Sequence, residues 1–246
     1  EEAMTQEQGV PGAILRAVVG STAHGLALEG TDDRDELAVY VEPIEGVAGF
    51  HQRETIVFRT AAEREHRADA PSQPGDLDLT AHGLRKFCRL ALGGNPTVLV
   101  LLFVQTAGCL VRTARGAQLQ ELAPAIVSRR AGGAFLGYLQ AQRQRLTGER
   151  GQKNVRRPDL EAVHGYDTKY AMHMLRLGVQ GVELMRTGRM TLPIPEPERS
   201  WLRGVRIGTV GLQWCLTRAG ELETEIRDLL HGGTPLPVEP DEVAVE

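Results

Sequence analysis

The hydrophobic pattern of this chain changes its period once, near residue 81, and this change most constrains the fold. Before that point, apolar and β-branched residues occur in short runs at 13–19 and 37–41, each bounded by glycine, proline or charged residues. Such runs are typical of buried strands. We expect two further short strands at 55–59 and 77–80.

After residue 81 the apolar positions Leu84, Cys88, Ala91 and Leu92 follow one another at helical spacing and share one helix face. Gly93-Gly94 ends this helix, and Asn95-Pro96 begins another, with asparagine as the cap and proline at the first helical position. Further helices are predicted at 116–122, 134–147, 166–188 and 197–230. Strands followed by helices indicate an α+β protein.

The same pattern suggests how the chain is divided. We expect a sheet-bearing domain at 1–130, a helical domain at 131–231 and a disordered, proline- and acid-rich tail at 232–246. Residues 60–75 have no hydrophobic period, so we expect a mobile loop there.

Composition excludes several classes of protein. Lys and Arg total 28 against 32 Asp and Glu, a net charge of −4, so any basic binding site must be local. Cys88, Cys109 and Cys215 lack the spacing of a zinc site or disulfide framework, and we interpret them as buried thiols in a reducing compartment. With no long apolar run and no signal-peptide pattern, we expect a cytoplasmic protein without membrane contact.

Two aspartates mark the start of the second predicted strand. Asp33 and Asp35 alternate with Arg34, so both carboxylates project from one face of the strand. Two such carboxylates are compatible with solvent or with a hard divalent cation, Mg²⁺ or Mn²⁺, between them. Asp78 would bring a third carboxylate to this place, and Asp76 is the alternative.

A glycine-serine turn follows the first predicted strand. Because Gly20 has no Cβ, the backbone N–H groups of Gly20 and Ser21 could approach a phosphate closely. Asp-rich and Gly-Ser turns are also common without any ligand, so the hypothesis depends on their combination.

That combination resembles a known family. Gly20-Ser21-Thr22-Ala23-His24-Gly25 followed by Asp33-Arg34-Asp35 resembles the GS…DxD signature of the DNA polymerase β nucleotidyltransferase superfamily. Further matches are similar to the RlaP-type predicted nucleotidyltransferases of bacteria and phages, named for their association with RNA ligases. These matches are Leu84-Arg85-Lys86-Phe87, Gly94-Asn95-Pro96-Thr97 and His164-Gly165-Tyr166-Asp167-Thr168-Lys169, with His173 and Arg176.

The resemblance implies a small mixed nucleotidyltransferase-type sheet with flanking helices and a helical C-terminal part that closes the nucleotide cleft. It implies that Asp33, Asp35 and Asp78 are the catalytic residues and bind Mg²⁺ or Mn²⁺, and that Gly20 and Ser21 contact the nucleotide triphosphate. Glu36-Leu37 departs from the family pattern, in which we expect an aliphatic residue followed by Arg.

A basic stripe runs along the predicted helix 166–188. Lys169, His173, Arg176 and Gln180 follow one another at +4, +3 and +4 and lie on one face, between apolar neighbours. The cationic members Lys169, His173 and Arg176 are candidate nucleotide-binding residues for the triphosphate. The alternative is an exposed basic stripe or a buried histidine with ordinary partners.

A second basic segment is a candidate RNA contact. Among its charged residues only Glu149 is acidic. This pattern suits binding to a phosphate backbone or, alternatively, a solvated helix end. The cations are Arg143, Arg145, Arg150, Lys153, Arg156 and Arg157.

The sequence therefore predicts a Mg²⁺-dependent nucleotidyltransferase, of the EC 2.7.7 type. It would move an NMP from an NTP substrate to an acceptor hydroxyl, with RNA (a tRNA or an RNA end) as the expected acceptor and partner. The alternatives are a transferase acting on a protein or small-molecule hydroxyl, and a non-catalytic nucleotide- or RNA-binding regulatory protein with the same fold.

Overall fold

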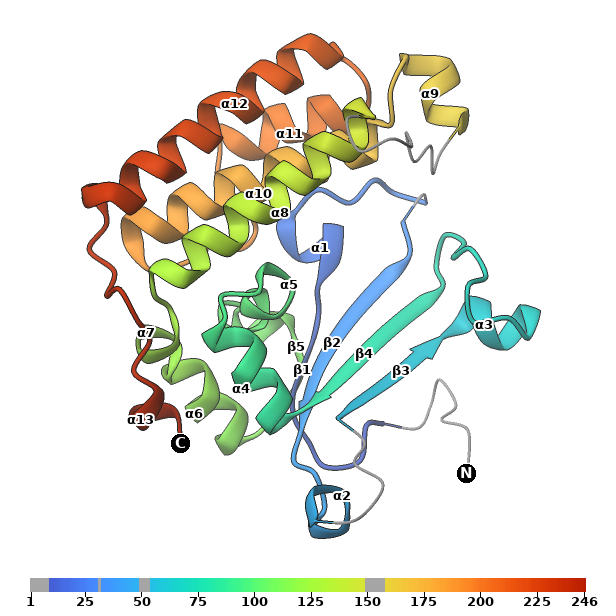
Figure 1. Ribbon diagram of the computed structural model, residues 1–246. Coiled ribbons are helices and arrows are strands. Elements are labelled where there is room, and N and C mark those ends of the chain that lie inside the picture. Colours follow the sequence, from blue (N-terminus) through green and yellow to red (C-terminus); the bar gives the residue numbers. More distant parts are fainter. Residues whose placement is uncertain (1–8, 31, 49–53, 149–157) are drawn as a thin grey trace. The chain divides into compact units, whose positions relative to one another are not determined.

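The computed structural model describes residues 9–30, 32–48, 54–148 and 158–246 (Figure 1). The chain divides into two compact units. The first, here called the sheet unit, comprises residues up to Ala91 together with Thr97–Ala123. The second, the helical unit, comprises Leu92–Pro96 and Pro124–Ala244.

Among the described residues, five strands form one mixed sheet in the order β3-β4-β2-β1-β5 (Figure 1). Only the central β2–β4 pair is parallel; β1 pairs antiparallel with β2 and β5, and β3 pairs antiparallel with β4. The strands are β1 (Ala13–Val18), β2 (Arg34–Tyr40), β3 (Thr55–Arg59), β4 (Leu77–Gly83) and β5 (Cys109–Arg112).

Alternation along the strands buries both faces of the sheet. Ala38 and Tyr40 of β2 join a cluster on one face, with Phe58 of β3 and Leu79 of β4. Leu37 of β2 points to the opposite face and is also buried. The central strand β2 is therefore covered on both of its faces.

The sheet unit contains elements that the sequence did not predict. The expected turn after β1 is a five-residue helix, α1 (Gly20–His24). The expected mobile loop at 60–75 begins with the helix α3 (Thr60–Glu65), and β5 was not predicted. The strand β4 runs to Gly83, after which α4 (Leu84–Leu92) begins. The sheet unit also contains α2 (Ile44–Ala48), α6 (Ala114–Glu121) and most of α5 (Pro96–Leu99).

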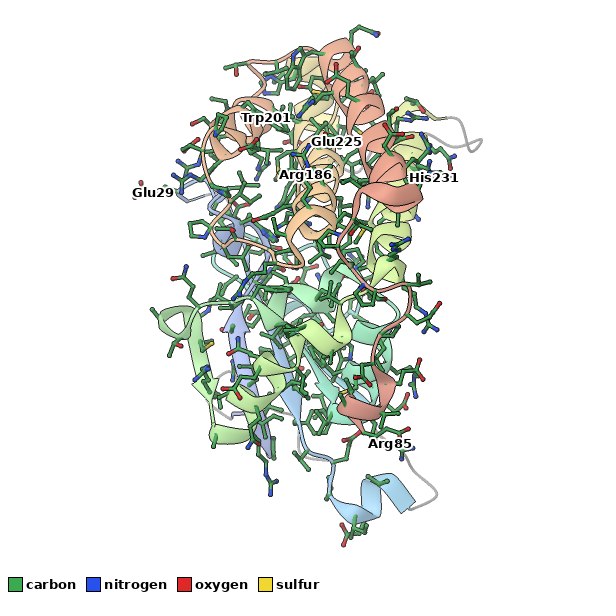
Figure 2. The ribbon with its side chains drawn as sticks, turned by 90° about the vertical axis from the view of Figure 1, so that its left-hand side faces the viewer. Glu29, Arg85, Arg186, Trp201, Glu225 and His231 are labelled. Atoms are coloured by element: carbon green, nitrogen blue, oxygen red, sulfur yellow. The ribbon has the colours of Figure 1, made fainter. Side chains whose placement is uncertain are left out.

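The helical unit is built around α10 (Thr168–Thr187), which packs against α8 (Arg129–Thr147), α11 (Glu198–Arg206) and α12 (Leu212–Asp228). The side chain of Asp167 caps α10 by accepting a hydrogen bond from the Tyr170 amide at 2.9 Å. Arg186 of α10 forms an ion pair with Glu225 of α12, and both are labelled in Figure 2. The helical unit also contains most of α7 (Ala123–Ile126) and the short helix α9 (Pro158–His164).

The single helix expected at 197–230 is two helices, α11 and α12. Gly208 lies between them with a φ of +77°, a conformation that L-residues rarely adopt and that ends a helix.

The prediction of a disordered tail is contradicted by the contacts of these residues. The carbonyl oxygens of Leu236 and Pro237 accept hydrogen bonds from Arg129 at 3.1 Å and 2.9 Å, and Glu242–Val245 form the short helix α13. Because these partners lie more than 100 positions upstream, composition alone could not indicate them.

The cysteine prediction is correct only in part. All three thiols are free, but only Cys215 is buried, whereas Cys88 and Cys109 are half-exposed. Burial raises the pKa of the Cys215 thiol. Within the part of the chain that the structure describes, no helix is both long and apolar enough to cross a lipid bilayer.

Candidate active site

The ends of four neighbouring strands meet at one edge of the sheet. The parallel strands β2 and β4 both begin there, with Arg34 in register with Leu77, and the antiparallel strands β1 and β3 both end there. Residues far apart in the sequence therefore become neighbours at this edge. Across it lie Arg59, Asp78, Asp35 and Gly20, in the order of the strands.

Three carboxylates gather at this edge. Asp35 and Asp78 are register partners on β2 and β4, so their side chains leave the same face of the sheet, and Asp33 lies two positions before Asp35. Each offers one oxygen, and the three oxygens lie within 4.8 Å of one another. Oxygen donors at this spacing fit a hard divalent cation such as Mg²⁺ or Mn²⁺.

Gly20 is packed directly against this cluster. Its φ is +61°, and a Cβ at this position would lie 2.1 Å from the Oδ2 atom of Asp35. Only glycine tolerates both the backbone conformation and the close carboxylate. Ser21, its predicted partner in phosphate binding, is 5% exposed, as the second residue of α1.

Asp76 is separated from the cluster by its own partners. Arg64 of α3 donates two hydrogen bonds to its carboxylate, at 2.7 Å and 3.0 Å, and the Gln73 amide donates a third at 2.7 Å. These hydrogen bonds, with that from Arg64 the strongest, hold the pKa of Asp76 below its ordinary value. Asp78, rather than Asp76, is the third member of the carboxylate cluster.

Glu36, at the position that departs from the family pattern, points away from the cluster. It follows Asp35 on β2 and therefore projects from the opposite face of the sheet. Its buried carboxylate is paired with Arg34 at 2.7 Å and with Arg16 at 2.5 Å. The extra acid thus forms a local ion triplet and adds no charge on the face of the carboxylate cluster.

The predicted basic stripe lies on α10, within the helical unit. Lys169, His173 and Arg176 are half-buried on one face of the helix, whereas Gln180 is 1% exposed. Arg176 donates a hydrogen bond to the Gln180 side chain at 2.8 Å. The helix thus presents three cationic or titratable groups in a row.

The predicted RNA-contact segment is only partly described. Arg145 is exposed near the end of α8, but Arg143 pairs with the buried Glu223 of α12 at 2.8 Å. Arg143 thus joins two helices within the helical unit. Arg150, Lys153, Arg156 and Arg157 lie outside the described residues.

Reasoning from the sequence did not identify Arg59 as part of the site. It ends β3 and pairs with Asp78, with 3.3 Å between Nε and Oδ1. An arginine at the end of a short strand carries no distinctive signal, since its partner lies 19 positions away in a strand of different orientation.

Comparisons with known proteins place the chain in one family. A family profile described as RlaP, the RNA repair pathway DNA polymerase beta family, matches residues 2–203. Among solved structures, the chain is similar to a nucleotidyltransferase-like protein from Exiguobacterium sibiricum, with 11% identity, 90% of this chain and 69% of that chain covered, and a TM-score of 0.32. No curated protein matches the chain.

Proposed function

Because the chain belongs to the RlaP family, the RNA repair pathway DNA polymerase beta family, we propose that it transfers a nucleoside monophosphate from an NTP to a hydroxyl group of RNA. The family supports a nucleotidyl-transfer role and typically uses a divalent metal. The observation that carries the proposal is the convergence of Asp33, Asp35 and Asp78, whose oxygens lie within 4.8 Å of one another.

These three carboxylates would hold Mg²⁺ or Mn²⁺. When bound, such cations stabilise negative charge on the phosphoryl group and lower the pKa of an attacking hydroxyl. A cation held there would explain why three acids persist side by side, since like charges at this distance repel one another unless a cation or hydrogen-bond donors compensate.

Within this mechanism the residues of the chain have distinct roles. Asp33 and Asp35 would hold both cations, and Asp78 would complete the ligand set of the cation near the acceptor. Asp78 would also accept the proton of the acceptor hydroxyl. Gly20 and Ser21 contact the triphosphate through the backbone. Lys169, His173 and Arg176 are assigned to the phosphates, where cationic groups neutralise the charge of the leaving pyrophosphate.

RNA is the acceptor that we favour, because the family is described as part of an RNA repair pathway. The positive segment near the end of α8, including the exposed Arg145, is assigned to the phosphate backbone of this acceptor.

The experiment is transfer of label from each α-³²P-labelled NTP, with Mg²⁺ or Mn²⁺, to a mixture of total RNA and protein. The control is the Asp33→Asn/Asp35→Asn variant, shown to be folded by its thermal unfolding. Ribonuclease-sensitive label with the wild type alone supports the proposal. Label on protein would show that the acceptor is a protein hydroxyl and not RNA. Binding of NTP without any transfer would favour a regulatory nucleotide-binding protein.

A further inference from the structure

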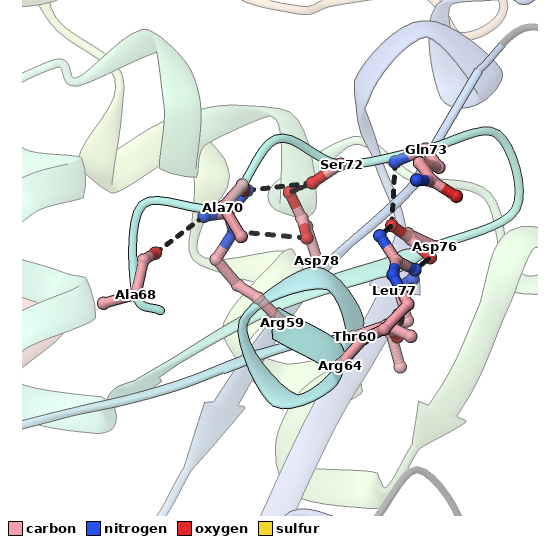
Figure 3. Close-up of polar contacts among 10 residues, drawn as sticks. All are labelled: Arg59, Thr60, Arg64, Ala68, Ala70, Ser72, Gln73, Asp76, Leu77 and Asp78. Carbon is pink, nitrogen blue, oxygen red and sulfur yellow. Dashed lines mark hydrogen bonds and ion pairs between the residues drawn. The ribbon is translucent and has the colours of Figure 1, made fainter. Parts of the chain in front are cut away.

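Asp78 is held at both of its carboxylate oxygens. The Nε atom of Arg59 lies 3.3 Å from Oδ1, and the hydroxyl of Ser72 donates a hydrogen bond to Oδ2 at 2.8 Å (Figure 3). The Asp78 side chain is only 23% exposed, so these donors meet it in a largely desolvated place.

Arg59 also fixes the donor on the other side. One of its Nη2 hydrogen bonds reaches the Ser72 hydroxyl at 2.8 Å, and another reaches the carbonyl oxygen of Ala70 at 3.0 Å, while Nη1 reaches that of Ala68 at 2.9 Å. Because the Ser72 oxygen accepts from Arg59, its own proton is directed to Asp78. Arg59, Ser72 and Asp78 thus form a closed ring of hydrogen bonds, visible in Figure 3.

The same loop has a second anchor that does not involve Asp78. Arg64 binds Asp76 with two hydrogen bonds, and the Gln73 amide binds it with a third. Arg59 and Arg64 thus hold the segment that follows α3 separately, and of these two anchors only that of Arg59 includes a member of the carboxylate cluster.

We propose that Arg59 and Ser72 are positioning residues that hold the Asp78 carboxylate in the orientation required to bind a divalent cation together with Asp33 and Asp35. This inference rests on the proposed function, because it assumes that the cluster binds a cation. A carboxylate has about four lone-pair sites, so two donors leave acceptor capacity for a metal. Groups that orient metal ligands in this way typically change metal affinity or activity by about 10–100-fold when they are removed.

Substitutions that keep the charge of the site separate the positioning of Asp78 from a purely electrostatic effect of Arg59 on the cation. If Arg59 acted only as a nearby positive charge, it would repel a cation, and its removal would strengthen cation binding. Ser72 is neutral, so Ser72→Ala removes the hydrogen bond and leaves the charge unchanged. Arg59→Lys keeps the charge and loses the planar fork that reaches Asp78, Ser72 and the loop carbonyls together.

The test is the affinity of the full chain for Mn²⁺ alone, measured by electron paramagnetic resonance of the free ion. We expect about 10–100-fold weaker binding for Ser72→Ala and Arg59→Lys, with Ser72→Thr close to wild type because it restores the hydroxyl. The matched control is Arg64→Gln, which releases the other anchor of the loop and should change the affinity by less than about twofold if positioning of Asp78 is what matters. Thermal unfolding without metal establishes that each variant is folded.

The outcomes separate the two proposals. If the wild type and Asp78→Asn both fail to bind Mn²⁺, the metal-dependent function itself is wrong. If Asp78→Asn loses binding while Ser72→Ala and Arg59→Lys retain wild-type affinity, only the positioning role is overturned. Equal losses in Ser72→Ala and Arg64→Gln would also overturn it, since order of the loop would then explain the effect. Should Ser72→Ala fail to fold, the Mn²⁺ affinity of Arg59→Lys decides the question.

Discussion

Gly20 and the Asp35 carboxylate lie so close together that a Cβ on residue 20 would be 2.1 Å from Oδ2 and 2.8 Å from Cγ of Asp35. Gly20, which begins α1 just after β1, is therefore in direct contact with the carboxylate cluster. A side chain here would have to displace Asp35 itself.

Gly20→Ala is expected to abolish Mn²⁺ binding, because the methyl group pushes Asp35 out of the cluster. It also costs about 1–2 kcal/mol of folding stability, since alanine must adopt a left-handed conformation. The matched control is Gly30→Ala: Gly30 has a similar φ of +71°, but its Cβ would meet no atom within 4 Å. Isothermal titration with Mn²⁺ and thermal unfolding of both variants distinguish a local clash from general backbone strain; equal metal affinity in the two variants would contradict the prediction.

Asp76 and Asp78 are two positions apart, and their substitution should affect different properties of the protein, stability for Asp76 and cation binding for Asp78. Asp78→Asn is expected to lose cation binding and nucleotidyl transfer while the fold persists. Asp76→Asn is expected to lower the unfolding temperature, because it breaks the pair with Arg64, and to leave the Mn²⁺ affinity within about twofold of the wild type. Measuring both properties in both variants checks the assignment, and the reverse pattern would show that Asp76 is the ligand.

The pair between Arg64 and Asp76 predicts a specific loss of stability in acid. Because the pKa of Asp76 is lowered in the folded chain, its contribution is fully present above the ordinary carboxyl value of about 3.9 and is lost as the pH falls through the lowered pKa. Arg64→Gln should therefore reduce stability at pH 7 and make the curve flatter below pH 4 or so. Urea unfolding across this pH range measures the difference, and parallel curves for variant and wild type would argue against it.

Glu36 is expected to matter for the fold and not for the metal. Glu36→Gln removes the charge that two arginines share in a buried place, and we expect a loss of about 1–3 kcal/mol in the free energy of unfolding. Mn²⁺ affinity should stay within about twofold of wild type, because Glu36 and Asp35 leave opposite faces of β2. Chemical denaturation and Mn²⁺ titration of the same preparation test both statements. A large change in affinity would mean that Glu36 contributes to the cation site.

Arg143 and Arg145 are neighbours on α8 with different expected roles. Arg143→Gln leaves the buried carboxylate of Glu223 with one fewer cation, so we expect a lower unfolding temperature. Arg145 is exposed, and Arg145→Gln should preserve stability while weakening RNA binding and reducing its salt dependence. Thermal unfolding and filter binding at several salt concentrations separate the two effects. Equal RNA affinity for Arg145→Gln and wild type would remove this residue from the acceptor site.

Short-range patterns predicted much of the fold. The strand Thr55–Arg59 was predicted with its observed bounds, and the α+β class followed from the change of hydrophobic period. The helix α3 was missed because Thr60–Glu65 has no apolar stripe, and the break at Gly208 was missed because one glycine in a helical pattern is a weak signal.

Spacing alone could group only those site residues that are close in sequence, and Asp78 could be named only with Asp76 as the alternative. Asp33 and Asp35 could be recognised from their alternation, but the role of Asp78 depends on its register with Asp35 across a parallel strand pair. The contacts of Arg59 with Asp78 and Ser72, and of Arg143 with Glu223, arise from tertiary packing that no local pattern encodes. Because such pairs bind individual arginines to buried acids, arginines that are close in the sequence need not form a single exposed surface.

Both tryptophans of the chain, Trp201 and Trp214, lie in the helical unit, where their rings meet edge to face at 5.5 Å. Trp201 is labelled in Figure 2. Tryptophan fluorescence, excited at wavelengths that tyrosine does not absorb, is therefore an optical signal from the helical unit, whereas paramagnetic Mn²⁺ would report from the carboxylates of the sheet unit. One denaturant titration read by both signals would show directly whether the two units melt as a single cooperative block or one after the other.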